Sequence, residues 1–528
     1  MKRLLALTVA LVGAVAVSAA EPAKPAIEFR LKSVVDLLPL VEYGGELAGQ
    51  ANNAEQVAAF IKMFTDQAKG LEGLDLKKPV GGYVIAAENP ADSPIVLMVP
   101  VADEEAFLGL LTDRADLTPK KEKDGSYSMD VPNFPTSVHL RFAHGYAYFG
   151  VRTAAGIAKD NLILPKDFFT AKDNTVFTAN VFPDRIPADL RKVAFGQLEL
   201  QLNDSINATE PVEKAFQKFL VDRAADMAKA VLMDGEKLSL ALTAAPKTDD
   251  IALELTLTPK SGTPLATTIG SWADRPSAAA SFATAVRGSA FAGALNFALP
   301  SETKAALNKL LDTAVENRMK SAKDGDKVAL KLVLDALLPT AKSGQLEFGI
   351  AGSGPDSKGK FGGAAAVRTE GGKQIDTVAR VLSVVIPADA AKIKYDIEKQ
   401  GDGQLHAITV PTLTDGPSKF AADTVHVYTS DPLIAASLSV NASGLKEMVA
   451  AKPGKTPMLL AEASVVKVFQ MTKELAADDF VRMTDQAFGK PVRDGDDLIR
   501  LTGTGGKDLR IKLSAKGRAL AFLRVVNE

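Results

Sequence analysis

The sequence predicts an α+β protein in which a domain made of an antiparallel sheet packed by helices occurs twice in tandem. The first observation is residues 238–258, where large aliphatic residues alternate with small or polar ones on both sides of a short polar turn. A period of two residues is typical of a strand with one apolar face, so this stretch predicts a β-hairpin. The second observation is that the layout recurs at residues 498–513, with fainter versions after Pro79 and Gly344.

The order of elements around these hairpins predicts the duplication. A strand, two helices, a hairpin and a further helix form a unit that we name X, which occurs four times. A second unit, Y, contains strands and a helix and occurs twice, at residues 124–159 and 402–450. The chain is therefore X-Y-X, linker, X-Y-X. This order predicts α+β domains at residues 27–272 and 288–528, joined by a linker at residues 273–287.

Two details of the second half follow from the same pattern. In the second copy of Y we expect a strand at residues 425–429 and helical stretches at residues 432–438 and 445–450. The fourth copy of X is expected to lack its last helix, because the chain ends there.

The N-terminus has the features of a secretory signal peptide. Lys2 and Arg3 precede an apolar run at residues 4–17, and Ser18-Ala19-Ala20 form a small-residue exit. We expect residues 1–20 to be removed and the protein to be exported, either to the periplasm or beyond the cell surface. An uncleaved N-terminal anchor is the alternative. No later apolar run approaches the ~20 residues that a membrane-spanning helix needs.

Composition excludes several classes of function. The chain has no cysteine, so disulfides and thiolate metal sites are excluded. Loss of Lys2 and Arg3 takes the formal charge from −2 to −4, and such a balanced surface gives no electrostatic reason to expect nucleic acid or an anionic membrane as partner. Aromatic residues make up 6% of the chain, with one tryptophan, which disfavours a carbohydrate-binding surface.

The four histidines are the first candidates for chemistry. His139, His144, His406 and His426 show no zinc-ligand spacing with a neighbouring carboxylate. We therefore expect all four to be isolated surface or interface residues.

Two motifs suggest enzymes and fail on inspection. Ser301-Glu302-Thr303-Lys304 matches the Ser-x-x-Lys of penicillin-recognising enzymes, but Lys342-Ser343-Gly344 then precedes the Ser-x-Asn at Ser439, which is the wrong order. Locally, Ser301 is predicted to cap a helix start and Gly344 to follow a helix end. The glycine-rich residues 503–507 lack the spacing of a phosphate loop and lie between two predicted strands, so we expect a hairpin turn.

Acidic turns at residues 494–497 and 324–326 suggest calcium. Neither has the alternating oxygen ligands and distal glutamate of a calcium loop, and the corresponding turn at residues 342–344 has no acid. A turn is therefore favoured over a metal site. The sequence nominates no catalytic, cofactor-binding or metal-ligating residue, and no cofactor.

One stretch supports a resemblance to a known set of proteins. Residues 73–83 are Gly-Leu-Asp-Leu-Lys-Lys-Pro-Val-Gly-Gly-Tyr, and they lead from a predicted helix into strands downstream of the signal peptide. This layout resembles uncharacterised exported bacterial proteins of the kind numerous in planctomycetes. The resemblance extends over most of the mature chain and implies an exported location, with no known activity.

Three functions remain as hypotheses. The leading one is an exported, non-enzymatic binding or scaffolding protein of the periplasm or cell envelope, because the two domains would present two similar surfaces to a partner. The second is a carrier of an apolar small molecule or lipid in a groove between sheet and helices. The third is a hydrolase without a recognisable motif. We expect the leucines of the hairpins to form ordinary core rather than to line such a groove.

Overall fold

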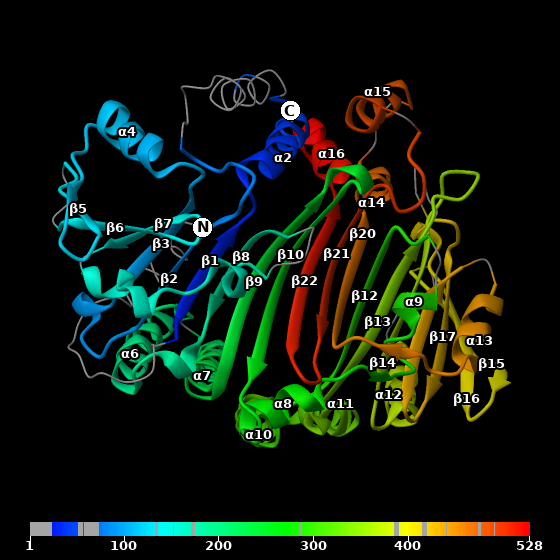
Figure 1. Cartoon of the computed structure of the whole chain (residues 1–528). Helices are drawn as coiled ribbons and strands as arrows, with labels where there is room; N and C mark the ends of the chain where they lie inside the picture. The colour runs from blue at the N-terminus through cyan, green and yellow to red at the C-terminus, as the bar shows by residue number, and fades with distance from the viewer. Residues whose placement is uncertain are drawn as a thin grey trace. The chain divides into compact units, whose positions relative to one another are not determined.

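The computed structural model describes residues 24–50, 56, 73–132, 136–151, 153–170, 175–208, 210–285, 288–384, 390–413, 420–439, 441–473, 477–489 and 491–527. The predicted signal peptide lies outside these residues. The predicted α+β class is confirmed, since antiparallel sheets carry helices in both halves of the chain (Figure 1). Two compact units can be distinguished. One takes in Met1–Gln201 and Asp226–Leu265, and the other takes in Leu202–Ala225 and Ala266–Glu528.

The first unit contains one antiparallel sheet with the strand order β10-β9-β8-β1-β2-β3-β7-β6-β5-β4. Its strands are β1 (Ile27–Leu31), β2 (Val80–Val84), β3 (Ile95–Pro100), β4 (Lys120–Lys121), β5 (Tyr127–Met129), β6 (Val138–Ala143), β7 (Tyr146–Val151), β8 (Thr175–Val181), β9 (Gly235–Ala245) and β10 (Asp250–Pro259). Strands β9 and β10 are the hairpin predicted at residues 238–258, with Leu240 opposite Leu255.

The second unit repeats this arrangement strand for strand. Its order is β22-β21-β20-β12-β13-β14-β18-β17-β16-β15, again antiparallel throughout. The strands are β12 (Phe291–Ala298), β13 (Gln345–Ser353), β14 (Gly362–Arg368), β15 (Lys392–Gln400), β16 (Gly403–Thr409), β17 (Thr424–Ser430), β18 (Leu433–Leu438), β20 (Leu459–Ser464), β21 (Leu498–Thr504) and β22 (Leu509–Lys516). A separate pair joins β11 (Arg275–Pro276) to β19 (Lys455–Thr456). The identical connectivity supports the tandem duplication.

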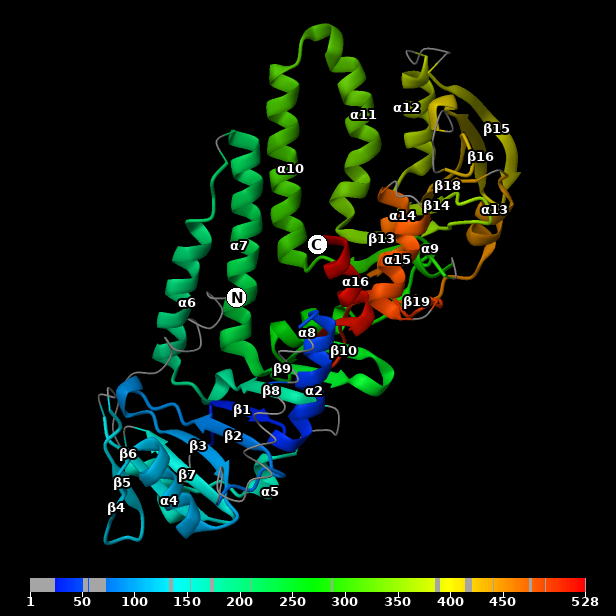
Figure 2. The ribbon, with the colours of Figure 1, turned by 90° about the horizontal axis from the view of Figure 1, so that it is seen from above.

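Most helices connect corresponding strands in the two halves, and α9 is an exception because no described helix precedes β1. In the first half they are α2 (Val34–Leu47), α4 (Glu104–Ala115), α5 (Pro165–Phe168), α6 (Ala188–Asn203), α7 (Pro211–Asp234) and α8 (Pro264–Ser271). In the second they are α9 (Phe282–Ala285), α10 (Ser301–Ser321), α11 (Asp324–Ser343), α12 (Gly372–Ser383), α13 (Ser443–Ala450), α14 (Val465–Thr472), α15 (Ala477–Phe488) and α16 (Gly517–Asn527). Helices α10 and α11 extend side by side away from the sheet of their unit (Figure 2).

The short 3₁₀ helices are η1 (Pro90–Asp92), η2 (Ala154–Ile157), η3 (Lys159–Asn161), η4 (Pro183–Arg185), η5 (Pro246–Thr248) and η6 (Pro411–Leu413). Side-chain caps hold the starts of some helices. The backbone N–H of Asp36 donates to Ser33 Oγ at 3.1 Å at the start of α2. Asp103 caps α4 in the same way by accepting from Ala106 N at 2.9 Å.

Two element predictions for the second half are wrong. Residues 432–438, expected to be helical, contain strand β18, which pairs with both β14 and β17. The alternation in this stretch is between small residues, and pairing with two neighbouring strands decides its conformation. The fourth copy of X also has its last helix, α16, in which Phe522 is fully buried. The predicted helix at residues 445–450 is confirmed by α13.

The stretch predicted as a linker contributes to the core of the second unit. Ser277, Ala279, Ala280 and Phe282 in this stretch are all buried. Gly349 on β13 makes this packing possible, because a Cβ at that position would lie 2.1 Å from the carbonyl oxygen of Ala279. The domain boundaries at residues 272 and 288 themselves stay predictions.

Candidate functional site

The leucines of the β9–β10 hairpin share one face of the first unit's sheet. Leu240 and Leu242 on β9 lie opposite Leu255 and Leu253 on β10, as the alternation predicts. On the other side of β9, Leu240 lies opposite Ala179 of β8, which in turn lies opposite Phe29 of β1. Because residues opposite one another in a sheet point to the same side, these side chains form one continuous apolar surface.

Much of this surface is exposed. Leu253 is 42% exposed, Leu255 is 37% exposed and Phe29 is 37% exposed, whereas Leu257 at the end of the hairpin is 4% exposed. The expectation that the hairpin leucines form ordinary core is therefore wrong for Leu253 and Leu255. Alternation shows that one side of a strand is apolar, but whether another layer covers that side depends on distant parts of the chain.

The corresponding face of the second unit is exposed as well. It carries Phe348, Val367, Leu346 and Leu513, each more than a third exposed. Phe348 of β13 lies opposite Leu295 of β12 and Val367 of β14, so these side chains are direct neighbours. We call these two exposed surfaces the apolar sheet faces. In the first unit the face is marked by Phe29, Leu253 and Leu255, and in the second by Leu346, Phe348, Val367 and Leu513.

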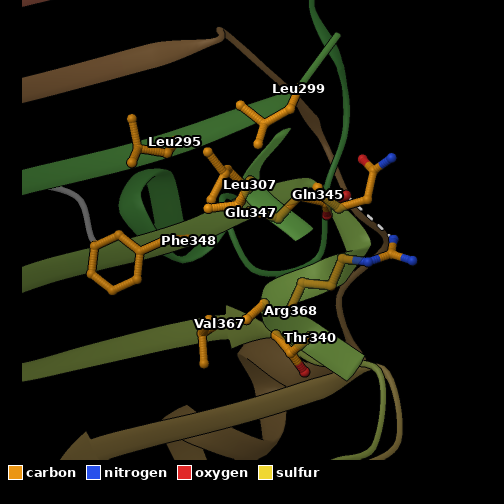
Figure 3. A pocket seen from close by; sticks show the side chains of 12 residues that line it. Leu295, Leu299, Leu307, Thr340, Gln345, Glu347, Phe348, Val367 and Arg368 are labelled. Atoms are coloured by element: carbon orange, nitrogen blue, oxygen red, sulfur yellow. Dashed lines mark hydrogen bonds and ion pairs between the residues drawn. The ribbon is translucent and has the colours of Figure 1, made fainter. Parts of the chain in front are cut away.

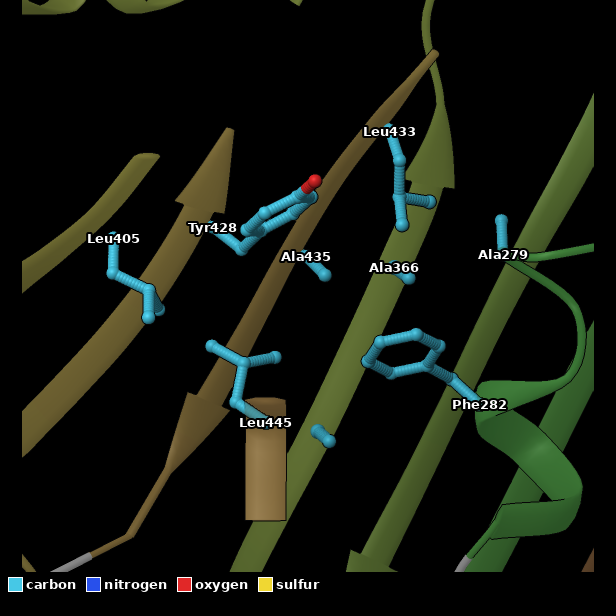
Figure 4. Close-up of a cluster of buried hydrophobic side chains, with 9 residues drawn as sticks. Ala279, Phe282, Ala366, Leu405, Tyr428, Leu433, Ala435 and Leu445 are labelled. Carbon is cyan, nitrogen blue, oxygen red and sulfur yellow. The ribbon is translucent and has the colours of Figure 1, made fainter. Parts of the chain in front are cut away.

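The opposite face of the second unit's sheet is covered. Side chains of Ala366, Leu405, Tyr428 and neighbouring strand residues pack against Leu445 of α13 and against Phe282 of α9 (Figure 4). This cluster is an ordinary hydrophobic core. The sheet of the second unit therefore has two apolar sides, of which one is covered by helices and the other is exposed.

A cavity of about 170 Å³ lies on the exposed side, where the ends of α10 and α11 nearest the sheet meet β12, β13 and β14 (Figure 3). Apolar side chains form most of its wall, and polar side chains lie at one end. The lining residues are Leu295, Leu299, Leu307, Thr340, Ala341, Gly344, Gln345, Leu346, Glu347, Phe348, Val367 and Arg368. Figure 3 places Gln345 and Arg368 at one end of this group and Phe348 and Leu295 at the other.

Ion pairs balance the charges at the polar end. Glu347 accepts from Arg368 at 3.3 Å and from Arg275 at 3.5 Å, and its second oxygen accepts from Ser277 Oγ at 2.8 Å. Burial lowers the pKa of Arg368, but its contacts with Glu370 and Glu347 outweigh burial and raise the pKa overall. The guanidinium therefore stays protonated, and both carboxylates have cationic partners.

The histidines behave differently from the sequence expectation. His144 is exposed and lies in the turn between β6 and β7, as expected. His406 and His426 are 2% and 7% exposed, so the expectation of surface positions is wrong for both. They lie on β16 and β17, each of which has a neighbouring strand on both sides, and the sheet and the residues packed on it exclude solvent.

His406 belongs to a polar cluster that resembles a catalytic triad in composition. Its Nε2 lies 2.9 Å from Thr429 Oγ1 and 3.4 Å from a carboxylate oxygen of Asp376. Its Nδ1 accepts a hydrogen bond from the backbone N–H of Asp396 at 3.1 Å. Because Nδ1 accepts, the proton of the neutral ring is on Nε2, and that nitrogen cannot take a proton from Thr429. The cluster is therefore arranged for structure and not for nucleophile activation.

The acidic turn at residues 494–497 accepts hydrogen bonds from the start of helix α14. Asp497 is buried and accepts from Ser464 Oγ and, at 3.0 Å, from the backbone N–H of Val466 at the start of α14. Asp494 forms an ion pair with Lys467 at 2.7 Å. No group of three or more metal-ligating side chains occurs among the described residues.

The two enzyme-like motifs lie at element ends. Ser301 is the first residue of α10, which follows Pro300 and has no side-chain cap, so the prediction that Ser301 caps this helix is wrong. Gly344, with φ of 69°, follows the last residue of α11 as predicted. Residues 505–508 connect β21 to β22, so the glycine-rich stretch is the predicted hairpin turn. Sequence reasoning missed the cavity residues because they come from separate strands and helices and form no motif.

Comparisons with known proteins identify no family for this chain. No protein-family model matches the chain, and no curated protein matches it. The structure titled "Structure of crystal form III of TP0453" is similar with a TM-score of 0.24 and 12% sequence identity, over 48% of this chain and 86% of that one. Crystal form I of TP0453 gives a TM-score of 0.23 and 11% identity, over 47% and 81%.

Proposed function

We propose that this protein is an exported, non-enzymatic binding protein whose ligand is an apolar small molecule or the apolar chain of a lipid. The observation that carries the proposal is the pair of apolar sheet faces. Each buried Å² of apolar surface contributes about 25 cal/mol, so exposed leucine and phenylalanine side chains gain free energy when a ligand covers them. Contiguous exposed apolar surface is typical of binding sites.

The cavity favours a small ligand over a flat protein surface. It is concave and apolar along most of its wall, as small-molecule sites usually are. The proposal therefore joins two hypotheses from the sequence, the binding protein and the carrier of an apolar small molecule or lipid.

Export rests on the predicted signal peptide at residues 1–20. Within the described part of the chain, no helix has the length and apolar character required to cross a bilayer. The resemblance to exported planctomycete-type proteins is consistent with this location and is itself part of the proposal.

The test compares substitutions on the sheet face with substitutions elsewhere. Leu253→Ser together with Leu255→Ser should weaken binding of a hydrophobic dye such as bis-ANS and reduce lipid mass retained in native mass spectra. Val193→Ser with Leu200→Ser on α6 is the matched control, because both side chains are at least as exposed but lie on a helix. Equal binding by the two double variants would overturn the proposal.

A second candidate is a scaffold for another exported protein. Val212, Phe216 and Leu220 on α7 are about half exposed or more and recur every four residues, which places them in one stripe. A stripe of this spacing suits an amphipathic helix of a partner. A discrete protein complex in native mass spectra that is lost on Phe216→Ser would favour this function, whereas retained lipid mass favours the first.

The absence of enzyme activity is part of the proposal. Support comes from the tautomer of His406, whose hydrogen bonds leave no free acceptor nitrogen for a neighbouring hydroxyl. Hydrolysis of short-chain esters or peptides that is lost on His406→Asn, in a protein that remains folded, would restore the hydrolase hypothesis.

A further inference from the structure

We infer that His406 makes the edge of the second unit's sheet sensitive to pH. Its neutral ring holds a bulge of strand β15 in place, and its protonated ring releases that bulge. Strand β15 lies at the end of the sheet, because it pairs with β16 and with no other strand of the described chain (Figure 1). This pH-sensitive joint is independent of the ligand named in the proposed function.

The bulge lies directly opposite the histidine. The pairing of β15 with β16 shifts register between Lys394 and Glu398, so residues 395–397 lie opposite His406 alone. Asp396 has φ of 52°, which is uncommon for a residue other than glycine. A bulge leaves backbone groups without their usual partners in the sheet. The backbone N–H of Asp396 donates to His406 Nδ1 at 3.1 Å, so a side chain here replaces a backbone acceptor.

The ring of His406 is enclosed by polar groups from three elements. Its Nε2 lies 2.9 Å from Thr429 Oγ1 of β17 and 3.4 Å from a carboxylate oxygen of Asp376 on α12. A carboxylate oxygen of Asp396 lies 3.8 Å from Nδ1. Arg380 of α12 donates to both carboxylates at 2.7–2.9 Å. The titratable and charged groups that face the ring are Asp376, Arg380, Tyr395 and Asp396.

Protonation reverses the role of Nδ1. In the neutral ring this nitrogen accepts a hydrogen bond, whereas both nitrogens of an imidazolium are donors. The new N–H would face the N–H of Asp396, so the hydrogen bond that holds the bulge is lost. The carboxylate of Asp396 could accept from the new N–H, but at 3.8 Å it is beyond hydrogen-bond distance. The bulge must therefore move before the charged ring is satisfied.

Acid favours the released bulge. Burial is the main cause that lowers the pKa of His406 while the bulge is held, although Asp376 opposes it. In a released and hydrated bulge the ring titrates near its ordinary pKa of about 6.5. The released state therefore binds the proton more tightly. Its population rises as the pH falls from about 6.5 to the folded pKa, by at most about tenfold per pH unit for a single proton.

The corresponding edge of the first unit has neither feature. There β4 pairs with β5 without a shift in register, and β5 is Tyr127–Met129, which contains no histidine. The two sheets share one strand order, so the first unit serves as an internal comparison. Bulge and histidine occur together in one half of the duplicated fold, which supports a specific role for His406 at the bulge.

Hydrogen exchange resolved to single amides tests the inference on the full chain. The protection factor of the Asp396 amide, which corrects for the pH dependence of intrinsic exchange, should fall about threefold or more between pH 7 and 5. The amide of Ser464 is the control, because it donates to the carbonyl of Ala290 at 2.9 Å and a carbonyl does not titrate in this range. Constant protection of Asp396, or an equal fall at both amides, would overturn the inference.

Two substitutions separate the acceptor from the proton. His406→Asn keeps an oxygen near the position of Nδ1 that does not titrate, so the Asp396 amide should stay protected without the pH dependence. His406→Gln places its polar end near Nε2 instead, so protection should be about tenfold lower at every pH, as expected for one lost hydrogen bond. His426→Asn, at the buried histidine of β17, is the matched control and should retain the pH dependence.

The variants can also contradict the inference. Retained pH dependence in His406→Asn would show that another group controls the bulge. Equal protection of Asp396 in His406→Asn and His406→Gln would show that Nδ1 is not the acceptor that matters. The pH profile of the unaltered protein requires no substitution, so it decides the question even if a variant does not fold.

Discussion

At the scale of single residues, the two buried histidines link the fold to pH. Burial is the main cause that lowers the pKa of His406, with Arg380 adding to it and Asp376 and Asp396 opposing it. Burial also lowers the pKa of His426, whose Nδ1 has no partner among the described residues. Both rings are therefore neutral in the folded protein near pH 7, and protonation opposes folding.

The first prediction concerns stability in mild acid. In the unfolded chain both histidines titrate near a pKa of about 6.5, and in the folded chain they titrate lower. Between these values the unfolded state binds more protons, so the free energy of unfolding decreases as the pH falls through this window and becomes level below the folded pKa. Urea unfolding of His406→Asn with His426→Leu should depend less on pH between 5 and 7. An unchanged slope would show that other groups control acid stability.

The second prediction compares two leucines of one strand. Leu257 is buried and Leu255 is exposed on the same face of β10. Leu257→Ala should lower the free energy of unfolding by about 2–4 kcal/mol, as truncations in cores do. Leu255→Ala should cost clearly less, about 1 kcal/mol, because more than a third of this side chain is already exposed to water. Similar costs, measured by chemical denaturation, would mean that another part of the protein covers the apolar sheet face.

At the scale of elements, close contacts and caps decide how strands and helices are placed. Gly349 of β13 lies against the backbone of Ala279, in the stretch that the sequence suggested was a linker. Asp497 in the turn before β21 holds the start of α14. Neither role follows from local propensity.

A third prediction tests the contact at Gly349. Gly349→Ala should lower the free energy of unfolding by about 1–3 kcal/mol, because the added Cβ collides with a carbonyl oxygen that must move. Gly325→Ala is the matched control, since no atom lies within 4 Å of the added carbon at this exposed start of α11. The control should be neutral or slightly stabilising in thermal unfolding. A neutral Gly349→Ala would show that residues 277–283 do not pack on β13.

The fourth prediction tests the acidic turn. Asp497→Ala leaves the Ser464 hydroxyl and the Val466 N–H buried without their acceptor, which should cost about 2–4 kcal/mol. Asp494→Ala removes an exposed partner of Lys467 and should cost under about 1 kcal/mol. Calcium should not change the melting temperature of the unaltered protein. A calcium-dependent rise that Asp497→Ala abolishes would restore the metal hypothesis.

At the scale of the whole molecule, the two halves share one order of strands, which supports duplication of a complete sheet-and-helix unit. The junction between them is less simple than a flexible linker. Arg275 and Pro276 form β11, and Phe282 is almost completely buried in the core of the second unit.

Limited proteolysis provides the fifth prediction. Thermolysin cleaves before large apolar residues, so an exposed linker would be cut at the Ser281–Phe282 bond. We expect this bond to be resistant in the native protein, because Phe282 is buried, and to be cut once urea unfolds the chain. Rapid native cleavage at this bond, with release of two folded halves, would instead support the linker predicted at residues 273–287.

The sequence by itself determined the features that depend on near neighbours along the chain. Alternation gave the β9–β10 and β21–β22 hairpins. The recurrence of these patterns in one order was sufficient to predict the α+β class and the duplication, because each copy must satisfy the same local rules.

Only the tertiary structure decided which apolar surfaces are covered. The alternation at Leu253 and Leu255 is the same whether or not a helix lies above them, and burial of His406 depends on strands that are distant in sequence. The cavity likewise joins Leu295, Leu307 and Val367, which come from a strand, a helix and another strand. Covering and enclosure arise from contacts between distant segments, and a periodic pattern in one segment carries no information about its distant neighbours.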